Sequence, residues 1–213
     1  RADDKTNANI LILGNSGQGK SYLLKLLLTN LRESGMKILC LDPEMEYEDL
    51  TDNLGGCFID LMGGEYLINP LEPKTWDDSG SPEDLDAPQT FRIRSRLSQH
   101  ISFLKDFFRT YKDFTDREID VIEIMLQKLY AKWGVSDRSD FDRLEPEDYP
   151  ILSDLYAFIE AEYKAFDEDK RQLYTAEMLQ NILLGLNSMC VGAESKFFNG
   201  HTNITDSSFV TFG

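Results

Sequence analysis

A glycine-rich loop between an apolar segment and a leucine-rich run is the feature that most constrains the fold of this chain. Residues 9–31 read NILILGNSGQGKSYLLKLLLTNL. The apolar residues 9–13 predict a short buried strand, and the spacing from Lys20 predicts a helix that Gly35 ends. Because this helix is apolar almost all round, we expect other layers to cover it on more than one side. Strand, loop and helix follow in the order that a phosphate-binding loop requires.

The loop has the pattern Gly-x-x-x-x-Gly-Lys-Ser of the P-loop, or Walker A motif. Its glycines permit backbone conformations that a Cβ would forbid, so several N–H groups can converge on an anion at the helix N-terminus. Lys20 would reach the β- and γ-phosphates of ATP, and the Ser21 hydroxyl would bind Mg²⁺. The predicted nucleotide-binding residues are Gly14, Asn15, Ser16, Gly17, Gln18, Gly19, Lys20 and Ser21. ATP and Mg²⁺ are therefore the predicted cofactors, and Lys20 is also a predicted catalytic residue.

Three carboxylates follow a second predicted strand. Residues 37–42, KILCLD, predict a buried parallel strand, and the next residues read PEMEY. The side chains of Asp42, Glu44 and Glu46 would lie at the carboxyl edge of the sheet, where open parallel sheets bind ligands. Alternatively, Asp42 caps the turn before Pro43, and the glutamates form the solvated side of a short helix. The functional interpretation makes Asp42 and Glu46 catalytic candidates that orient water or the metal shell.

A hairpin and a connector are predicted next. Residues 57–61 and 66–68 have the composition of two short strands on either side of a Gly-Gly turn. The following residues, to about 89, are rich in Pro, Asp, Ser and Gly and show no apolar period. They predict a connector between two parts of the chain.

Beyond the connector the apolar period becomes that of amphipathic helices. Four stretches place their apolar residues on one stripe, at residues 91–111, 116–133, 153–166 and 171–189. Thr115 and Glu118 form a capping box in front of the second helix. Aromatic side chains on the stripes, including Phe107 and Trp133, are expected in the core. The four helices predict a small helical bundle.

The negative charge of the chain is concentrated in its helical half. The net charge is −16, and residues 1–71 account for only −5 of it. We do not expect this acidic segment to contact DNA, because it would repel the phosphate backbone. It is either a solvated surface or a docking face for a basic partner. Three cysteines and two histidines argue against disulfides and a zinc site.

Several segments together resemble one family of proteins. The family is the large ATPase of type IV secretion and conjugative transfer systems, within the HerA/FtsK superfamily of hexameric motors. The resemblance rests on the order of GNSGQGKS, LDPEMEY, GGCFIDLMGGEYLINPLEP, LSDLYAF and SKFFNGHTNI. It implies a homo-hexamer that works with other proteins of the secretion machine. It also implies a cytoplasmic location, or one at the inner face of the cell membrane through those partners.

The resemblance further implies an α/β P-loop NTPase fold of RecA-like type, here a partial core with an inserted all-α helical bundle. We assign residues 1–73 to the first part of the ATPase core, 74–90 to the connector, 91–190 to the all-α insertion domain, and 191–213 to the return into the core, where the chain is truncated. In that family the glycine loop binds nucleotide and Mg²⁺, and the acids of DPEMEY face the same site. The resemblance thus supports the residues chosen above from the motif.

The sequence departs from such motors in two respects. They require an apolar strand that ends in Asp-Glu to hold Mg²⁺ and activate water, and a later arginine supplied across a subunit boundary. Neither is found, and residues 204–213, ITDSSFVTFG, predict only the opening of a further strand. We therefore expect the ATP-binding part of a motor ATPase that powers conjugative DNA transfer or type IV secretion. The parent protein should be an ATPase, and this fragment alone should be inactive.

Two other functions stay open at this point. A P-loop kinase or another phosphotransferase would share the loop, but it would need a substrate lid and an acceptor site. A non-catalytic interaction module would carry a vestigial loop, and the intact Lys20 and Ser21 argue against that. A following strand that ends in Asp-Glu would decide for the motor.

Limited proteolysis tests the predicted domain division. The connector at residues 74–89 is polar and contains prolines, so we expect a protease to cut it before the helices. Mass spectrometry of the first fragments measures the cut sites. Cleavage spread evenly through residues 91–190 would show that the division is wrong.

Overall fold

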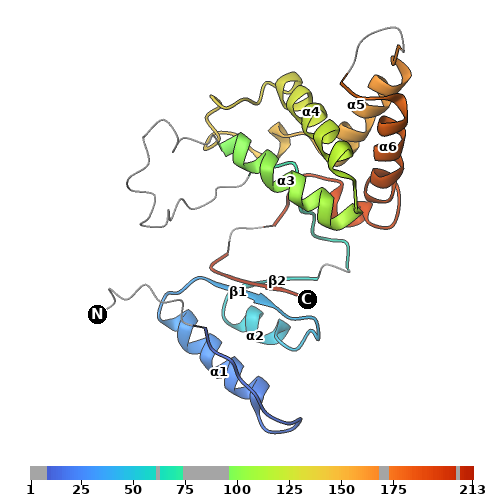
Figure 1. The fold of residues 1–213 in the computed structure, drawn as a ribbon. Helices are drawn as coiled ribbons and strands as arrows, with labels where there is room; N and C mark the ends of the chain where they lie inside the picture. Colours follow the sequence, from blue (N-terminus) through green and yellow to red (C-terminus); the bar gives the residue numbers. More distant parts are fainter. Residues whose placement is uncertain (1–8, 61–62, 74–95, 168–172, 205–206) are drawn as a thin grey trace, which may run out of the picture. The chain divides into compact units, whose positions relative to one another are not determined.

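The computed structural model describes residues 9–60, 63–73, 96–167, 173–204 and 207–213. The predicted connector at 74–90 lies outside these residues. The chain forms two compact units, of which unit 1 comprises residues 1–63 and 205–213, and unit 2 comprises residues 64–204 (Figure 1). The domain boundaries expected from the sequence, at 73, 90 and 190, stay a prediction.

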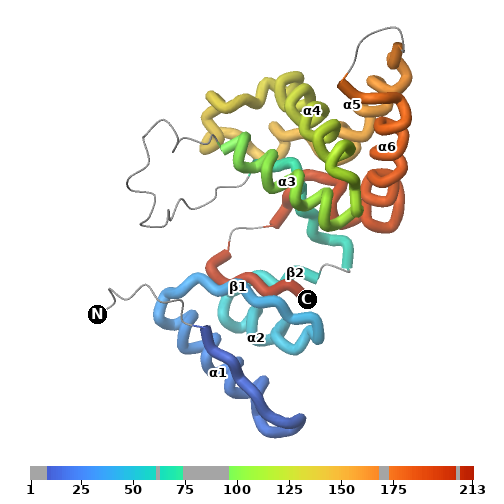
Figure 2. Tube along the Cα trace, in the orientation of Figure 1, coloured from blue at the N-terminus to red at the C-terminus, as the bar shows by residue number. Residues whose placement is uncertain are grey.

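Unit 1 contains a parallel sheet of three short strands. They are β1 (Ile38–Leu41), β2 (Cys57–Ile59) and β3 (Phe209–Phe212). The order is β1-β3-β2, so the strand from the end of the chain lies between the two earlier ones (Figure 2). Ile38 pairs with Phe209, and Cys57 pairs with Val210. The strand predicted at residues 37–42 is confirmed, and it is parallel to its neighbour as expected.

The strand predicted at residues 9–13 is wrong. These residues form no regular secondary structure, and Ile10, Leu11 and Leu13 are each at least 76% exposed. A segment becomes a strand only when a neighbouring strand takes its backbone hydrogen bonds. None of the strands in the described part of the chain pairs with it.

Two helices accompany the sheet of unit 1, α1 (Lys20–Glu33) and α2 (Glu48–Asn53). The start and end of α1 agree with the sequence, because it begins directly after the glycine loop and stops before Gly35. The expected burial of α1 is wrong, since none of its residues is buried. Four leucines are more than a third exposed: Leu23, Leu24, Leu26 and Leu31. Apolar composition cannot bury a helix unless other layers lie against it.

The predicted hairpin is also wrong. β2 pairs with the distant β3, and residues 66–68 form no strand. Instead, the Leu67 N–H donates to Asn203 Oδ1 at 2.7 Å, and the Ile68 N–H donates to the Phe197 carbonyl at 3.0 Å. The local apolar pattern cannot predict a pairing between segments that are more than a hundred residues apart.

Unit 2 is helical, and the four predicted helices are confirmed. They are α3 (Arg96–Lys112), α4 (Asp116–Lys132), α5 (Leu152–Lys164) and α6 (Ala176–Cys190), followed by the short α7 (Ser195–Phe198). The predicted capping box is present, because Thr115 Oγ1 accepts from the Glu118 N–H at 3.3 Å and Glu118 Oε2 accepts from the Thr115 N–H at 2.9 Å. No described helix is both long enough and apolar enough to cross a lipid bilayer.

The apolar stripes of the four helices meet in one core. Fully buried members include Leu104, Phe108, Ile119, Ile122, Leu126, Leu155, Ile159, Leu179, Ile182 and Leu186. Phe107 packs against this core, but Trp133 is 38% exposed, so its expected burial is wrong. Trp133 is the C-cap residue of α4 and lies beyond the turns that face the core.

The segment 69–73 is packed into unit 2, although we expected it in the first part of the ATPase core. Leu71 is fully buried, and its carbonyl accepts a 2.5 Å hydrogen bond from the Tyr130 hydroxyl on α4. The buried His100 Nε2 lies 2.9 Å from the Pro70 carbonyl, and Asn69 Nδ2 donates to the Pro150 carbonyl at 3.0 Å. Buried carbonyls need such partners, which polar side chains of the helical unit supply.

Replacing Tyr130 by Phe should destabilise unit 2. The change leaves the Leu71 carbonyl without this donor, at a cost of about 1–2 kcal/mol in the free energy of unfolding. Urea unfolding followed by circular dichroism measures it. Tyr163→Phe is the matched control, since Tyr163 is exposed on α5. Equal losses for both variants would contradict the role of this hydrogen bond.

The same hydroxyl should make stability depend on alkaline pH. Burial raises the pKa of Tyr130 far above its ordinary value of about 10. The unfolded chain therefore releases this proton first, so the hydroxyl's contribution is complete below about pH 10 and falls as pH rises further. Unfolding at neutral pH and above pH 10 measures this fall, which Tyr130→Phe should reduce.

Candidate functional site

The glycine loop, residues 14–21, lies at the N-terminus of α1. Gly17 and Gly19 both have φ of +80°, a conformation that residues with a Cβ rarely adopt. Gly19 is the N-cap, no side chain caps the helix, and its first turn contains no acidic residue. The positive end of the helix dipole and its first amides therefore face the loop, which suits a bound anion.

The peptide of Asn15 closes the loop. Its N–H donates to Gln18 Oε1 at 3.2 Å, and its carbonyl accepts from Lys20 Nζ at 2.8 Å. The Gln18 N–H also lies 3.4 Å from the same carbonyl. Gln18 was predicted only as one position of the motif. Its side-chain contact could not be read from the pattern, in which this position accepts any residue.

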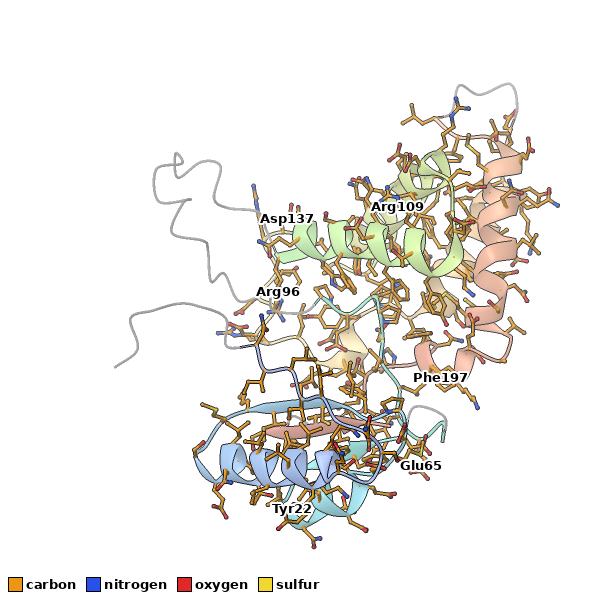
Figure 3. The ribbon with its side chains drawn as sticks, turned by 60° about the horizontal axis from the view of Figure 1, so that its bottom comes forward. Tyr22, Glu65, Arg96, Arg109, Asp137 and Phe197 are labelled. Atoms are coloured by element: carbon orange, nitrogen blue, oxygen red, sulfur yellow. The ribbon has the colours of Figure 1, made fainter. Side chains whose placement is uncertain are left out.

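The residues fit a nucleotide with Mg²⁺. Two left-handed glycines and an uncapped helix start supply backbone donors, Lys20 supplies a charge, and Ser21 places a hydroxyl in the first turn of α1. The described residues contain no group of three or more His, Cys, Asp and Glu that could hold a metal by themselves. This agrees with Mg²⁺ chemistry, in which one or two side chains act together with phosphate oxygens and water. Next to the serine, Tyr22 is 75% exposed on α1 (Figure 3).

The acidic turn, residues 42–47, follows β1 at the carboxyl edge of the sheet. Asp42 is 3% exposed, and its Oδ2 accepts from the Tyr47 N–H at 2.8 Å. The Asp42 carbonyl accepts from the Met45 N–H at 3.1 Å, and Met45 has a left-handed φ of +55°. The Asp42 carboxylate therefore holds the turn together, as the capping alternative predicts.

Glu44 and Glu46 are exposed on the same turn. No hydrogen bond or ion pair joins Asp42 or Glu46 to the glycine loop in the described parts of the chain. Their catalytic roles therefore stay a prediction. Burial is the main cause that raises the pKa of Tyr47, and the neighbouring carboxylates add to it. Burial and the charge of Asp42 likewise raise the pKa of Cys40.

All three strands end at this edge because they are parallel. The Asp42 N–H donates to the Phe212 carbonyl at 2.7 Å, and the Gly213 N–H donates to the Ile59 carbonyl at 3.0 Å. Helix α1 reaches the acidic turn through Lys25, whose Nζ lies 5.4 Å from the centre of the Tyr47 ring. Open parallel sheets bind their ligands at the carboxyl edge.

The chain has a glycine loop at the start of a helix, followed by a parallel sheet with an acidic turn at its carboxyl edge. These features define an α/β protein of the P-loop NTPase type with a partial core. The family model of the central domain of the helicase HerA matches residues 5–184. The chain belongs to this family.

Individual relatives agree with the family. The solved structure of VirB4 from Thermoanaerobacter pseudethanolicus matches 100% of this chain with a TM-score of 0.79 and 29% identity, over 51% of that protein. TraC of Escherichia coli K12 is 31% identical over 99 residues, which are 46% of this chain and 10% of TraC. A protein of Bacillus anthracis without an assigned function is 27% identical over 94% of this chain and 32% of its own length.

These likenesses confirm the predicted fold class and the resemblance to the ATPases of type IV secretion and conjugative transfer. The chain spans about half of VirB4 and less of the curated relatives that it matches. The activity, substrates and partners of the full-length protein are therefore proposed below.

Removing the Asp42 carboxylate should destabilise unit 1. Asp42→Ala leaves the buried Tyr47 N–H without its acceptor, at a cost of about 1–3 kcal/mol. Glu46→Ala is the matched control, because an exposed acid on the same turn should change stability by less than about 0.5 kcal/mol. Native-state hydrogen exchange of the β1 and β3 amides reports on unit 1 alone. The capping role fails if the two variants exchange at equal rates.

Proposed function

We propose that this chain is the ATP-binding part of a motor ATPase that powers conjugative DNA transfer or type IV secretion. The observation that carries the proposal is the glycine loop, with two left-handed glycines, Lys20 and Ser21 at the uncapped start of α1. Membership of the HerA family and the likeness to VirB4 and TraC favour a motor over a kinase or an interaction module.

The proposed roles follow from the chemistry of the groups. The amides of residues 14–21 bind the phosphates of ATP, and the Lys20 ammonium compensates their charge. The Ser21 hydroxyl binds Mg²⁺, which stabilises the negative charge that develops during phosphoryl transfer. Glu46, exposed at the carboxyl edge, is the remaining candidate to orient water, whereas the Asp42 carboxylate already binds the Tyr47 N–H.

The wider setting is proposed from the family. The whole protein acts as a homo-hexamer together with other proteins of the secretion machine, in the cytoplasm or at the inner face of the membrane. The segment after position 71 has a net charge of −11, so it meets protein partners or solvent rather than DNA, whose phosphate backbone it would repel. Hydrolysis by the parent protein, rather than by this segment alone, drives the machine.

Calorimetry of ATP binding tests the proposal. Lys20→Ala removes the charge opposite the phosphates and should weaken ATP binding by roughly 2–5 kcal/mol. Lys37→Ala is the charge-matched control, since Lys37 is exposed and lies outside the loop. We expect the control to bind ATP with the affinity of the unsubstituted chain. Equal affinities for all three proteins, or no binding by any, would exclude the proposed role of the loop.

A further inference from the structure

The acidic turn is joined to the helix that carries the glycine loop by a contact between Lys25 and Tyr47. The 5.4 Å separation of Lys25 Nζ from the ring centre is in the range of a cation–π interaction. Lys25 makes no ion pair with any residue that the structure describes, so the ring is the group that its ammonium meets. Lys25 follows Lys20 by about 7.5 Å along the helix axis.

Tyr47 is fixed to the rest of unit 1 by buried hydrogen bonds. Its N–H donates to Asp42, and its carbonyl accepts from both the N–H and the Oγ1 of Thr51, at 2.9 Å and 2.8 Å. Thr51 Oγ1 lies 2.6 Å from Thr211 Oγ1 on β3, and both threonines are 0% exposed. The Tyr47 backbone therefore moves with α2 and the centre of the sheet.

Helix α1 also contacts β1, but it is packed loosely. None of its residues is buried, and near its end Arg32 Nε donates to the Leu54 carbonyl at 3.4 Å. Lys25 and Arg32 thus tie the helix to residues 47 and 54, on either side of α2. Lys25 is the attachment nearer the glycine loop. Its contact with Tyr47 therefore links the loop end of α1 to the acidic turn.

We propose that Tyr47 is a positioning residue, which through Lys25 couples the nucleotide at the glycine loop to the acidic turn. Glu46 precedes Tyr47 in the chain, so a shift of Tyr47 relative to α1 also shifts Glu46 relative to the bound phosphates. This inference rests on the proposed binding of ATP at the loop. It assigns a role to the Tyr47 ring, in addition to the hydrogen bonds of the Tyr47 backbone.

The test compares ATP binding with the response of the acidic turn. Calorimetry gives the affinity for Mg²⁺-ATP, and hydrogen exchange with and without Mg²⁺-ATP follows the amides of Tyr47 and Thr51. In the unsubstituted chain we expect ATP to slow their exchange by roughly fivefold or more. Tyr47→Leu and Lys25→Met should bind ATP within about threefold of the unsubstituted chain yet lose this slowing.

Two conservative variants separate coupling from packing. Tyr47→Phe keeps the ring, and the Tyr47 hydroxyl makes no hydrogen bond to a described residue. Lys25→Arg keeps the charge. Both should retain the ATP-dependent slowing. A role of Tyr47 in stability alone would not predict the loss of slowing in Lys25→Met, in which the Tyr47 ring is unchanged. If circular dichroism shows that Tyr47→Leu unfolds unit 1, Lys25→Met tests the coupling instead. Lys25 is only partly buried, so its substitution should leave unit 1 folded.

Failure of this inference can be told from failure of the proposed function. Tight ATP binding without slower exchange in the unsubstituted chain overturns the coupling alone. Retained slowing in Lys25→Met, or equal loss in Tyr47→Phe and Tyr47→Leu, also overturns it. ATP binding that is absent, or unchanged by Lys20→Ala, overturns the proposed function and this inference with it.

Discussion

The parallel pairing of β3 with both β1 and β2 is the constraint on which the rest of unit 1 depends. It places Phe209 and Thr211 at 0% exposure and brings the last residues of the sequence between two strands that come much earlier in the sequence. The acidic turn is anchored there, because the backbone N–H of Asp42 donates to the carbonyl of Phe212. The carboxyl edge, and with it every group proposed to act at that edge, is thus completed only when the chain returns after unit 2.

Unit 2 is therefore an insertion, and its two ends are held together by hydrogen bonds. Residues 67–69 meet residues 197–203, where Leu67, Ile68 and Asn69 donate from their backbone N–H groups to Asn203, Phe197 and Thr202. An inserted unit is tolerated when its ends lie close together. The buried segment 69–73 then links this junction to the helical core through Tyr130 and His100.

The burial of Asp42 explains its structural role in the acidic turn. A buried carboxylate is costly unless hydrogen bonds compensate it, and the Tyr47 N–H supplies one. Glu46, by contrast, is exposed, and its catalytic role stays a prediction. The same turn contains a left-handed Met45, so its shape is held by these bonds rather than by an intrinsic preference of its residues.

The sequence by itself determined the features that depend on neighbouring residues: the glycine loop, the start of α1, the four helices of unit 2 and the capping box at Thr115. Tertiary structure decided the rest. Residues 9–13 remain unpaired, α1 stays exposed, β2 pairs with β3 rather than with residues 66–68, and segment 69–73 packs with the helices. The physical reason is that helix period, caps and glycine conformations act over a few residues. Strand pairing and burial depend on partners that lie far along the chain, which no local pattern specifies.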